Sequence, residues 1–473
     1  MVINQNNKNI LKDISICFIN PPILDYALYD LFAIPLGILK TINLLKFFGI
    51  DYFYLDALNK NFDLSYFPKG TIKPTIRSNG TGKYWKKKIE PPVELKFFNR
   101  EFYRFGLSFE KIIEILKNEI SKRKKSFDFI VISSIFTYHY LSLKILIQYL
   151  KENFQNTKII IAGIYPKIIF EHAKSLGADY VFKEDAFEFV KFIFELTSKD
   201  NSHIELLKES NLIYKNTQDN DSFDILPDWD LLDNQRYGVI RLTSGCPYNC
   251  QYCASKIISG EYKKLDLSYS LTQLSYFVKR NIFNIAFYDD ALLIDQNLFL
   301  TFIFEARKVS LKFIFYLPNA IHIAKTTKEI LNAMQNFKMI RFGLESLNIE
   351  DEKYGNKFKI DQLKNLLNNL NESKIPKEVV SFYILVGLPG QSFAEVENTI
   401  KTALKLGIKP RIAEYSPIPS TPLFERAKQE LIANKKSYIN IDEPLFQNPS
   451  IYPYIATEFT QENMKKLKNM IYG

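Results

Sequence analysis

Short apolar runs and amphipathic stretches alternate along the first 200 residues of the chain. The run 14–19 predicts a buried strand that ends at the breaker Asn20-Pro21-Pro22, and an apolar-periodic helix from Pro35 to Phe48 leads to a second strand at 51–55. The alternation continues with helices at 109–123, 140–153, near 170 and from 186, and with strands at 128–133, 158–162 and 179–182. Strands this continuously apolar, separated by helices, are typical of a parallel sheet covered on both faces. The pattern predicts a doubly wound α/β domain whose ligands lie at the carboxyl ends of its strands.

Two segments depart from this alternation. Residues 60–108 are rich in proline, glycine, lysine and aromatic residues, which favours a structured insertion. Residues 197–236 are polar and irregular, and we expect them to form a linker. The first domain is therefore predicted to cover residues 1–196 as a Rossmann-like (flavodoxin-like) parallel sheet that carries the insertion.

The alternation of strands and helices returns after the predicted linker. Strands are expected at 239–243, 285–288, 313–317, 339–344, 379–386 and 411–415, with helices such as 267–280, 296–309, 360–373 and 393–406 between them. Six such repeats predict a partial (β/α)6 barrel over 237–425, an incomplete relative of the eightfold barrel, with its chemistry at the carboxyl ends of the strands. Residues 426–473 form a C-terminal extension, which we expect to close the open side of the barrel.

The composition limits the protein class without naming a function. Of the 473 residues, 47% are hydrophobic and 24% are charged, as in an ordinary soluble globular protein, and the net charge is +10. The lysines are spread along the chain, with the densest basic runs at 86–88 and 122–125, which indicates solvated faces rather than a nucleic-acid track. The polar N-terminus shows no signal peptide, and no uncharged apolar run reaches the roughly 18 residues of a membrane span. We expect a cytoplasmic protein, because thiols stay reduced in that compartment.

Three of the four cysteines lie within the eight residues 246–253, CPYNCQYC, which we call the cysteine loop. The spacing C-x3-C-x2-C, directly after the first barrel strand, lets three thiolates converge. An iron–sulfur cubane takes thiolates as ligands, and three sulfurs leave its fourth iron free for another ligand. A closed zinc site needs a fourth ligand that no nearby Cys or His offers, and a redox pair of Cys250 and Cys253 would leave Cys246 without a role. The remaining cysteine, Cys17, is predicted to be a small buried hydrophobe in its strand.

The cysteine loop resembles the signature of the radical S-adenosylmethionine (SAM) superfamily, including the aromatic Tyr252 just before the third cysteine. The resemblance implies that Cys246, Cys250 and Cys253 hold a [4Fe–4S] cluster and that SAM binds the unique iron, with Tyr252 as a cofactor-binding residue. It also implies reductive cleavage of SAM to a 5′-deoxyadenosyl radical. The electron would come from an external donor such as flavodoxin or ferredoxin.

Three further strand ends extend the resemblance. Asp289-Asp290 follows the second barrel strand, where the family often has Gly-Gly-Glu, and Asp289 is predicted to hydrogen-bond the SAM ammonium or the substrate. Glu345, in the segment RFGLES, resembles the glutamate that contacts SAM, since a carboxylate can accept both ribose hydroxyls. Gly387 and Gly390, in GLPG, permit close backbone approach and match the family's region near the adenine. Solvated turn residues, a helix-start acid and an ordinary strand turn are the structural alternatives at these positions.

The N-terminal domain resembles the cobalamin-binding-like domain of one large radical SAM subfamily. The matching pieces are Asn20-Pro21-Pro22, Pro35-Leu36-Gly37, Ser133-Ser134, Ala162-Gly163 and the acidic turn near Glu184. The D-x-H-x-x-G motif, whose histidine ligates cobalt, is absent. Cobalamin binding therefore stays open against a domain that only shapes the substrate cavity.

These features leave three functions. The first is methyl transfer through methylcobalamin to an unactivated carbon of a small-molecule, peptide or lipid substrate held between the domains. The second is a radical rearrangement, cyclisation or oxidation, with cobalamin absent or only redox-active. The third is a non-catalytic iron–sulfur binding protein, against which Glu345 and the segment 387–390 speak.

Overall fold

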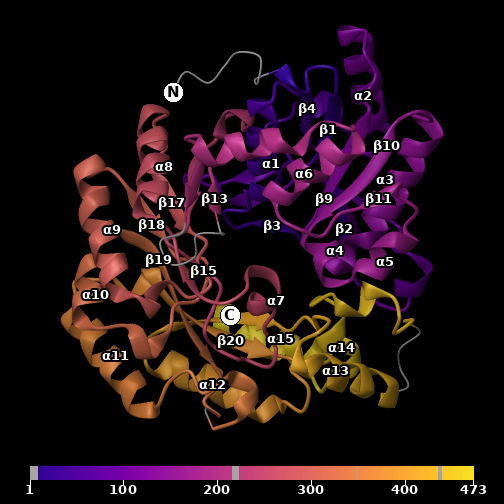
Figure 1. Cartoon of the computed structure of the whole chain (residues 1–473). Coiled ribbons are helices and arrows are strands. Elements are labelled where there is room, and N and C mark those ends of the chain that lie inside the picture. The colour runs from indigo at the N-terminus through magenta and orange to yellow at the C-terminus, as the bar shows by residue number, and fades with distance from the viewer. Residues whose placement is uncertain (1–8, 216–222, 349, 435–438) are drawn as a thin grey trace. The chain divides into compact units, whose positions relative to one another are not determined.

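The computed structural model describes residues 9–215, 223–348, 350–434 and 439–473 (Figure 1). The chain divides into two compact units, with the boundary between residues 235 and 236. Within the described ranges, no helix is long and apolar enough to cross a membrane.

The first unit is built on a five-stranded parallel sheet. In spatial order its strands are β4 (Asp51–Asp56), β1 (Ser15–Asn20), β9 (Phe129–Ser134), β10 (Lys158–Gly163) and β11 (Tyr180–Val181). Numbered along the chain, this order is 2-1-3-4-5, so the predicted flavodoxin-like arrangement is confirmed. The strand order reverses between β1 and β9, where such sheets bind their ligands.

Helices cover this sheet, as the apolar runs of its strands require. Helices α1 (Leu36–Phe47) and α6 (Ala186–Leu196) pack side by side, and α2 (Phe109–Arg123) packs with α3 (Tyr140–Asn153) (Figure 1). The short helices α4 (Ile164–Ile168) and α5 (Phe170–Ser175) follow β10. Side-chain caps fix two helix starts: Ser108 accepts a hydrogen bond from the backbone N–H of Lys111, and Asp185 accepts from that of Phe187.

The insertion is structured, and it recruits residues that precede it. Two three-stranded antiparallel sheets form, in the orders β2 (Ile23–Asp25), β8 (Phe102–Phe105), β7 (Lys86–Ile89) and β3 (Tyr29–Asp30), β6 (Gly82–Lys83), β5 (Thr75–Ile76). Their apolar cluster contains Leu58, Tyr84, Tyr103 and Phe105. The strands β2 and β3 lie before α1 in the chain, so the insertion completes sheets begun at residue 23.

The segment 197–236, expected as a linker, folds onto the first unit instead. It contains a 3-10 helix (Asn201–Glu209) and the antiparallel pair β12 (Ile213–Lys215) and β13 (Phe223–Ile225), while residues 216–222 lie outside the described residues. Four apolar side chains join the core under α1 and α6: Ile204, Leu207, Ile213 and Ile225. Apolar positions this sparse among polar residues give no periodic signal, so the sequence pattern does not reveal them.

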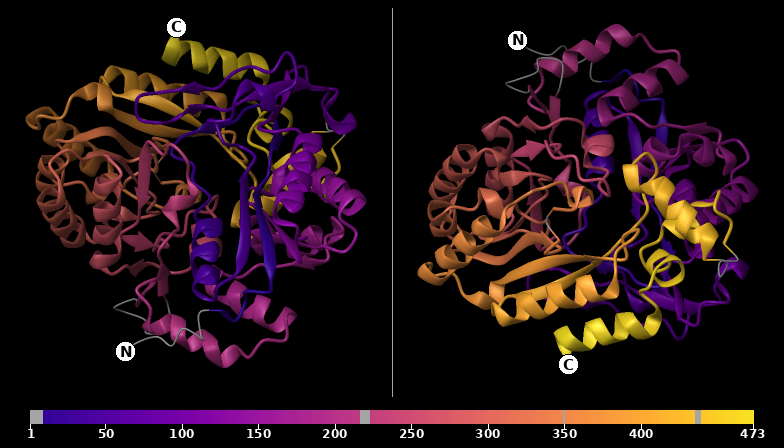
Figure 2. Two further views of the ribbon diagram at one scale, coloured as in Figure 1. Left: turned by 90° about the horizontal axis from the view of Figure 1, so that it is seen from above. Right: turned by 90° about the horizontal axis from the view of Figure 1, so that it is seen from below.

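The second unit is a six-stranded parallel sheet whose strands follow chain order. They are β14 (Tyr237–Ile240), β17 (Asn284–Phe287), β18 (Ile314–Tyr316), β19 (Phe337–Glu345), β20 (Val380–Val386) and β21 (Lys409–Glu414). Helices α8 (Leu267–Lys279), α9 (Gln296–Val309), α10 (Lys328–Ala333), α11 (Ile360–Glu372) and α12 (Phe393–Lys405) lie outside the strands (Figure 2). The predicted partial (β/α)6 barrel is confirmed.

The C-terminal extension belongs to the second unit. Its helices are α13 (Pro422–Ala433), α14 (Tyr452–Ala456) and α15 (Gln461–Tyr472). Helix α15 packs against α12 and against β21, which is an edge strand of the sheet. Lys468 on α15 donates to the Glu414 carboxylate at the end of β21 over 2.9 Å, so the extension is tied to that edge.

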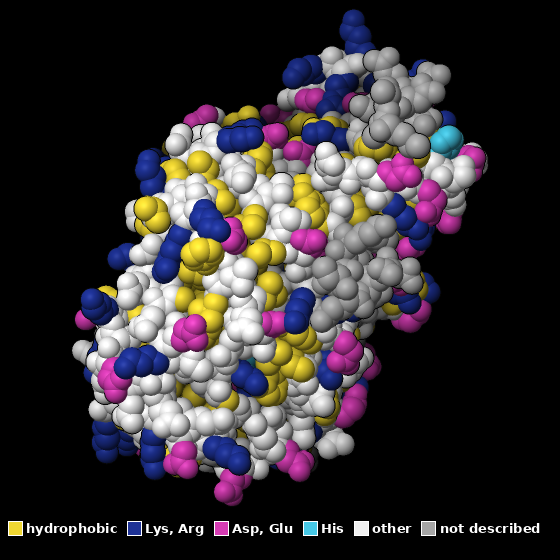
Figure 3. Space-filling view, turned by 60° about the vertical axis from the view of Figure 1, so that its left-hand side comes forward, with side chains coloured by type: hydrophobic (Ala, Val, Ile, Leu, Met, Phe, Trp, Pro, Cys, Tyr) yellow, Lys and Arg dark blue, Asp and Glu magenta, His cyan; other side chains and the backbone are white. Residues whose placement is uncertain are grey.

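Basic side chains are dispersed on the face shown in Figure 3. Lys and Arg alternate there with Asp and Glu and with apolar side chains, without a continuous basic track.

Candidate active site

The cysteine loop is positioned by two short strands of the second unit. It lies between β15 (Thr243–Ser244) and β16 (Lys263–Lys264), which pair antiparallel directly after β14, and helix α7 (Ser255–Ser259) follows it. Gly245 begins the loop with φ +73°, and a Cβ there would lie 2.3 Å from the carbonyl oxygen of Glu261. Only glycine fits a position that combines this conformation with this close approach.

Asp289 holds the chain just ahead of the cysteine loop. Its Oδ1 accepts hydrogen bonds from the backbone N–H of Leu242 (2.9 Å), from that of Thr243 (2.7 Å) and from the Thr243 hydroxyl (2.7 Å). Burial raises the pKa of Asp289 to about 6. Asp290, rather than Asp289, lines the cavity beside the cysteines. The structure thus gives Asp289 Oδ1 a structural task, while its contact with SAM or the substrate stays a prediction.

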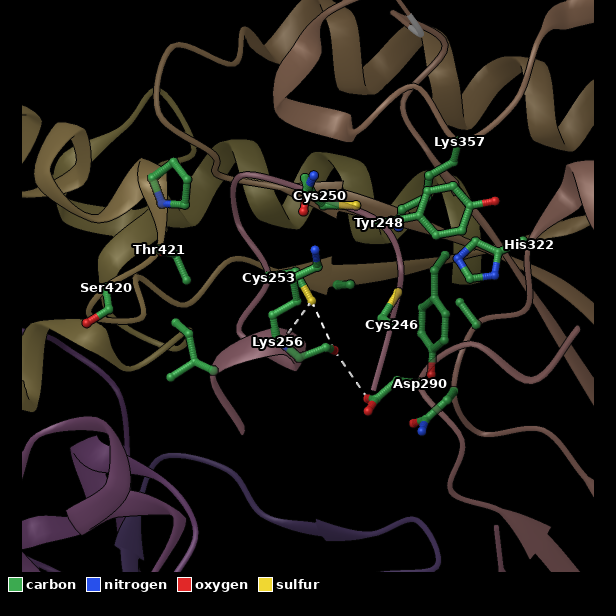
Figure 4. Close-up of a pocket in the computed structure, with 18 of the residues that line it drawn as sticks. Cys246, Tyr248, Cys250, Cys253, Lys256, Asp290, His322, Lys357, Ser420 and Thr421 are labelled. Atoms are coloured by element: carbon green, nitrogen blue, oxygen red, sulfur yellow. Dashed lines mark hydrogen bonds between the residues drawn. The ribbon is translucent and has the colours of Figure 1, made fainter. Parts of the chain in front are cut away.

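A cavity of about 580 Å³ opens beside the cysteine loop (Figure 4). The three sulfur atoms face a common space in it, from one stretch of chain. The polar side chains that line it from other elements include Asp290, Asn319, His322, Lys357 and Tyr383. Several of these residues follow the carboxyl ends of strands β17 and β18, where a barrel of this type collects its chemistry.

The three sulfurs differ in their surroundings. Cys246 and Cys250 are buried, and burial raises the pKa of both thiols, that of Cys250 to about 11. Cys253 is exposed and accepts from the backbone N–H of Ser255 at 3.5 Å, and the Ser255 hydroxyl donates to Asp290 at 3.2 Å (Figure 4).

The three cysteines lie around one cavity. A cubane can bind each cysteine through a different iron, so this set of thiols fits a cluster. Over the ranges that the structure describes, no three His, Cys, Asp or Glu side chains converge as the ligands of one ion would.

Lys357 links Glu345 and Tyr252 by hydrogen bonds. Glu345 ends β19 with φ +59°, an uncommon conformation for a residue with a side chain, at a point where the register with β20 shifts. Lys357 Nζ donates to Glu345 Oε1 over 2.6 Å and to the Tyr252 hydroxyl over 2.9 Å. Burial, followed by the charge of Glu345, raises the pKa of Tyr252 well above its ordinary value. The structure thus brings two of the predicted site residues together in one partly buried network.

Comparison with known families agrees with this geometry. Residues 240–403 match the family described as the Radical SAM superfamily. The chain contains a radical SAM domain. Its matched range begins at the end of β14 and includes the cysteine loop, Glu345 and the turn 387–390.

Sequence and structural relatives extend the comparison beyond the radical SAM domain. An uncharacterized methyltransferase of Pyrococcus horikoshii is 25% identical over 272 residues, which cover 53% of this chain and 54% of that protein. The alignment with this curated relative thus covers about half of its length. Two structures of the radical SAM methyltransferase TsrM from Kitasatospora setae superpose with TM-scores of 0.59 and 0.58 at 12% and 11% identity. They cover 88% of this chain and 76% and 75% of TsrM, so the fold is shared over most of the chain.

Both TsrM structures contain bound groups. One holds tryptophan and a SAM analogue, and the other holds cobalamin and a [4Fe-4S] cluster.

The two glycines predicted near the adenine touch other parts of the radical SAM domain's unit. Gly387 and Gly390 have φ values of +88° and +67°. A Cβ on Gly387 would lie 2.5 Å from the Pro453 ring, and one on Gly390 would lie 2.0 Å from the Arg426 guanidinium. The close approach that these glycines permit is therefore made by the C-terminal extension. Their contact with a cofactor stays a prediction.

Sequence reasoning missed two residues on the cavity of the radical SAM domain. His322 is 6% exposed and stacks on Tyr248 with ring centroids 4.5 Å apart, and its Nδ1 has no partner among the described groups. Burial, helped by the charges of Lys357 and Lys325, lowers the pKa of His322 to about 3, so the ring is neutral. The scarcity of histidine, with only four in the chain, could have identified His322. Lys357 gives no such signal in a chain rich in lysine.

Proposed function

We propose that this chain is a cobalamin-dependent radical SAM methyltransferase that acts on an unactivated carbon. The observation that carries the proposal is the set of three cysteines around one cavity at the carboxyl ends of the barrel strands. Cys246, Cys250 and Cys253 would hold the [4Fe–4S] cluster. When bound, the cluster and SAM supply a 5′-deoxyadenosyl radical that can abstract hydrogen from carbon.

Side chains on the cavity, together with Glu345, which Lys357 links to it, would bind and orient SAM and the substrate. Glu345 would accept the ribose hydroxyls, with its carboxylate fixed by Lys357. Asp290 lines the cavity and offers a negative charge to an ammonium group. The neutral ring of His322 offers a hydrogen-bonding nitrogen without adding charge.

Cobalamin would bind at the carboxyl edge of the first unit's sheet. Ile135 and Phe136, just after β9 at the switch point, are 44% and 46% exposed and offer apolar surface to a flat ring. His139, in the same segment, is buried and paired with the Asp25 carboxylate at 3.0 Å. That pairing agrees with the absent cobalt-ligating motif, so we propose cobalamin without a histidine below the cobalt.

The likeness to proteins named methyltransferases supports methyl transfer as the outcome. Tryptophan in TsrM supports a small-molecule substrate for this chain as well. We further propose an external electron donor and a cytoplasmic location, since the exposed Cys253 side of the site needs reducing conditions.

Anaerobic reconstitution with iron, sulfide and hydroxocobalamin, followed by metal analysis of the desalted protein, tests the proposal. Wild-type protein should retain iron and stoichiometric cobalt and should absorb at about 400 nm. It should also cleave SAM when reduced with dithionite. Cys250→Ala should lose the iron and keep the cobalt. Cys17→Ala, which removes the buried cysteine of β1, is the matched control and should keep both.

Two outcomes would change the proposal. Unchanged iron in Cys250→Ala would contradict the cluster assignment. Iron without cobalt in the wild type would leave a radical SAM enzyme whose first unit is structural, and a rearrangement, cyclisation or oxidation would then be the better function.

A further inference from the structure

Lys357 is a largely buried cation on the same cavity as the three cysteines. Its side chain is 15% exposed, and it lies two residues after Gly355, where a Cβ would come within 2.6 Å of Cys250 Sγ. Burying an ammonium group costs several kcal/mol unless partners compensate it. The position of Lys357 therefore needs another explanation than that of a solvent-exposed surface lysine.

The partners of Lys357 keep it charged. Glu345 Oε1 at 2.6 Å and the Tyr252 hydroxyl at 2.9 Å accept its hydrogen bonds. Burial by itself would lower the pKa of Lys357, but the charge of Glu345 and the contacts with Tyr252 and Cys250 raise it well above the ordinary value. Since Tyr252 lies inside the cysteine loop, the ammonium is fixed to the same chain segment as the sulfurs.

The lysine, rather than its glutamate partner, faces the cavity of the sulfurs. Lys357 is among the residues that line this cavity together with Cys246, Cys250 and Cys253, whereas Glu345 is not. The ion pair thus presents its positive end to the ligands of the cluster.

A positive field at the cluster favours the state with the extra electron. Net charge, hydrogen bonds to the sulfurs and solvent exposure set the potential of iron–sulfur clusters over a range of roughly 1 V. Residues that touch the ligands rather than the metal adjust such properties. A fixed ammonium among thiolates acts in the direction of easier reduction.

We infer that Lys357 is a positioning residue that raises the midpoint potential of the cluster on Cys246, Cys250 and Cys253 and holds the Glu345 carboxylate in place for SAM. The inference rests on the proposed function, because it needs a cluster at these cysteines. It assigns opposite effects on the potential to two residues in contact, since Lys357 supplies the positive end and Glu345 the negative end. A lysine that only neutralises a buried glutamate would not change the midpoint potential of the cluster in this way.

An EPR-monitored redox titration of the reconstituted protein without SAM measures the effect. Lys357→Met should lower the midpoint potential relative to wild type, and Glu345→Gln should raise it, because the ammonium then acts without its counter-charge. The double variant should lie between the two single variants. Lys357→Arg keeps the charge and should restore the wild-type potential.

Lys353→Met is the matched control. Lys353 is also buried, lies four residues earlier and pairs with Asp351 over 2.8 Å, but it does not line the cavity. Lys353→Met should keep the wild-type midpoint potential. A shift seen only in Lys357→Met would therefore come from the cation that lines the cavity.

Equal potentials for wild type, Lys357→Met and Glu345→Gln would overturn the inference while leaving the cluster assignment intact. If Lys357→Met does not retain iron, Glu345→Gln decides, because an unchanged or lowered potential in that variant contradicts the inference. A wild-type protein that takes up no iron would instead overturn the proposed function itself.

Discussion

The ends of strands β17 and β19 each carry a buried carboxylate, and the two acids have different partners. Asp289 and Glu345 are 4% and 7% exposed. The Oδ1 of Asp289 accepts from backbone and hydroxyl donors at the start of the cysteine loop, whereas Glu345 accepts from the ammonium of Lys357 on the cavity. The two acids therefore share a place at the edge of a parallel sheet, and we propose that their partners separate a scaffold acid from a site acid.

The largest effect is expected from a substitution that displaces Cys250 in the cysteine loop. Gly355→Ala adds a Cβ that would meet Cys250 Sγ at 2.6 Å in a backbone with φ +77°. We expect this variant to lose most of its iron, measured by metal analysis after reconstitution, because neither the backbone nor a cluster ligand can yield that far.

Gly177→Ala, in the first unit, is the control for backbone strain. Gly177 has φ +84° but nothing within 4 Å of its Cβ position. This variant should lose roughly 1 kcal/mol of unfolding free energy and keep its iron. Full iron retention in Gly355→Ala would show that Cys250 is not held as tightly as the contact indicates.

The scaffold role of Asp289 predicts a dependence of stability on pH. Its pKa rises from 3.8 when unfolded to about 6 when folded, so its stabilising contribution is complete below pH 3.8 and is lost as the pH rises through 6. Asp289→Asn removes this loss and can keep the three hydrogen bonds through its amide oxygen. Relative to wild type, the variant should gain on the order of 2–3 kcal/mol of unfolding free energy between pH 4 and pH 7. Urea unfolding of the metal-free proteins measures the difference, and a constant value across this pH range would contradict the assignment.

The site role of Glu345 predicts weaker SAM binding when its charge is removed. Glu345→Gln should keep the cluster and lose roughly tenfold in SAM affinity, as expected for one charge-assisted hydrogen bond. Asp289→Asn is the matched comparison and should bind SAM as wild type does. Equilibrium binding to the reconstituted proteins measures both affinities. Equal affinity in Glu345→Gln and wild type would place Glu345 with Asp289, as a structural acid.

The smallest effects are expected at the turn after β20. Gly390→Ala meets only the guanidinium of Arg426, whose side chain is 56% exposed and can move, so the cost should be the roughly 1 kcal/mol of the backbone conformation. Gly387→Ala meets the Pro453 ring, which cannot rotate away, and should destabilise more. If Gly387→Ala instead weakens SAM binding without loss of stability, the turn belongs to the cofactor and the sequence prediction for it is correct.

The sequence predicts elements well where the signal is local. Helices α2, α3 and α9 begin and end at the predicted residues, because their apolar periodicity is continuous and their starts are marked by caps or polar breaks. The cysteine loop is predicted by spacing alone. Both kinds of signal lie within about 15 residues of chain.

The features that the sequence hides depend on partners far along the chain. Nothing near Asp289 indicates that it caps residues 242 and 243, and nothing near Gly387 indicates Pro453. Lys357 is twelve residues from Glu345, beyond any helical or strand period, and only the folded loop brings the two together. A residue type at a strand end can therefore be predicted, but its partner cannot.

The bonds from Asp289 to Leu242 and Thr243 involve no metal, and this bears on how the protein matures in a cell. Many small metal domains fold only when the ion arrives. Here the barrel fixes the chain three residues ahead of Cys246 as soon as it folds. We expect iron and sulfide to reach an ordered site, so that a cell starved of iron would hold folded, inactive protein that can take up its cluster later. A pulse–chase measurement showing the same half-life with and without iron would bear this out.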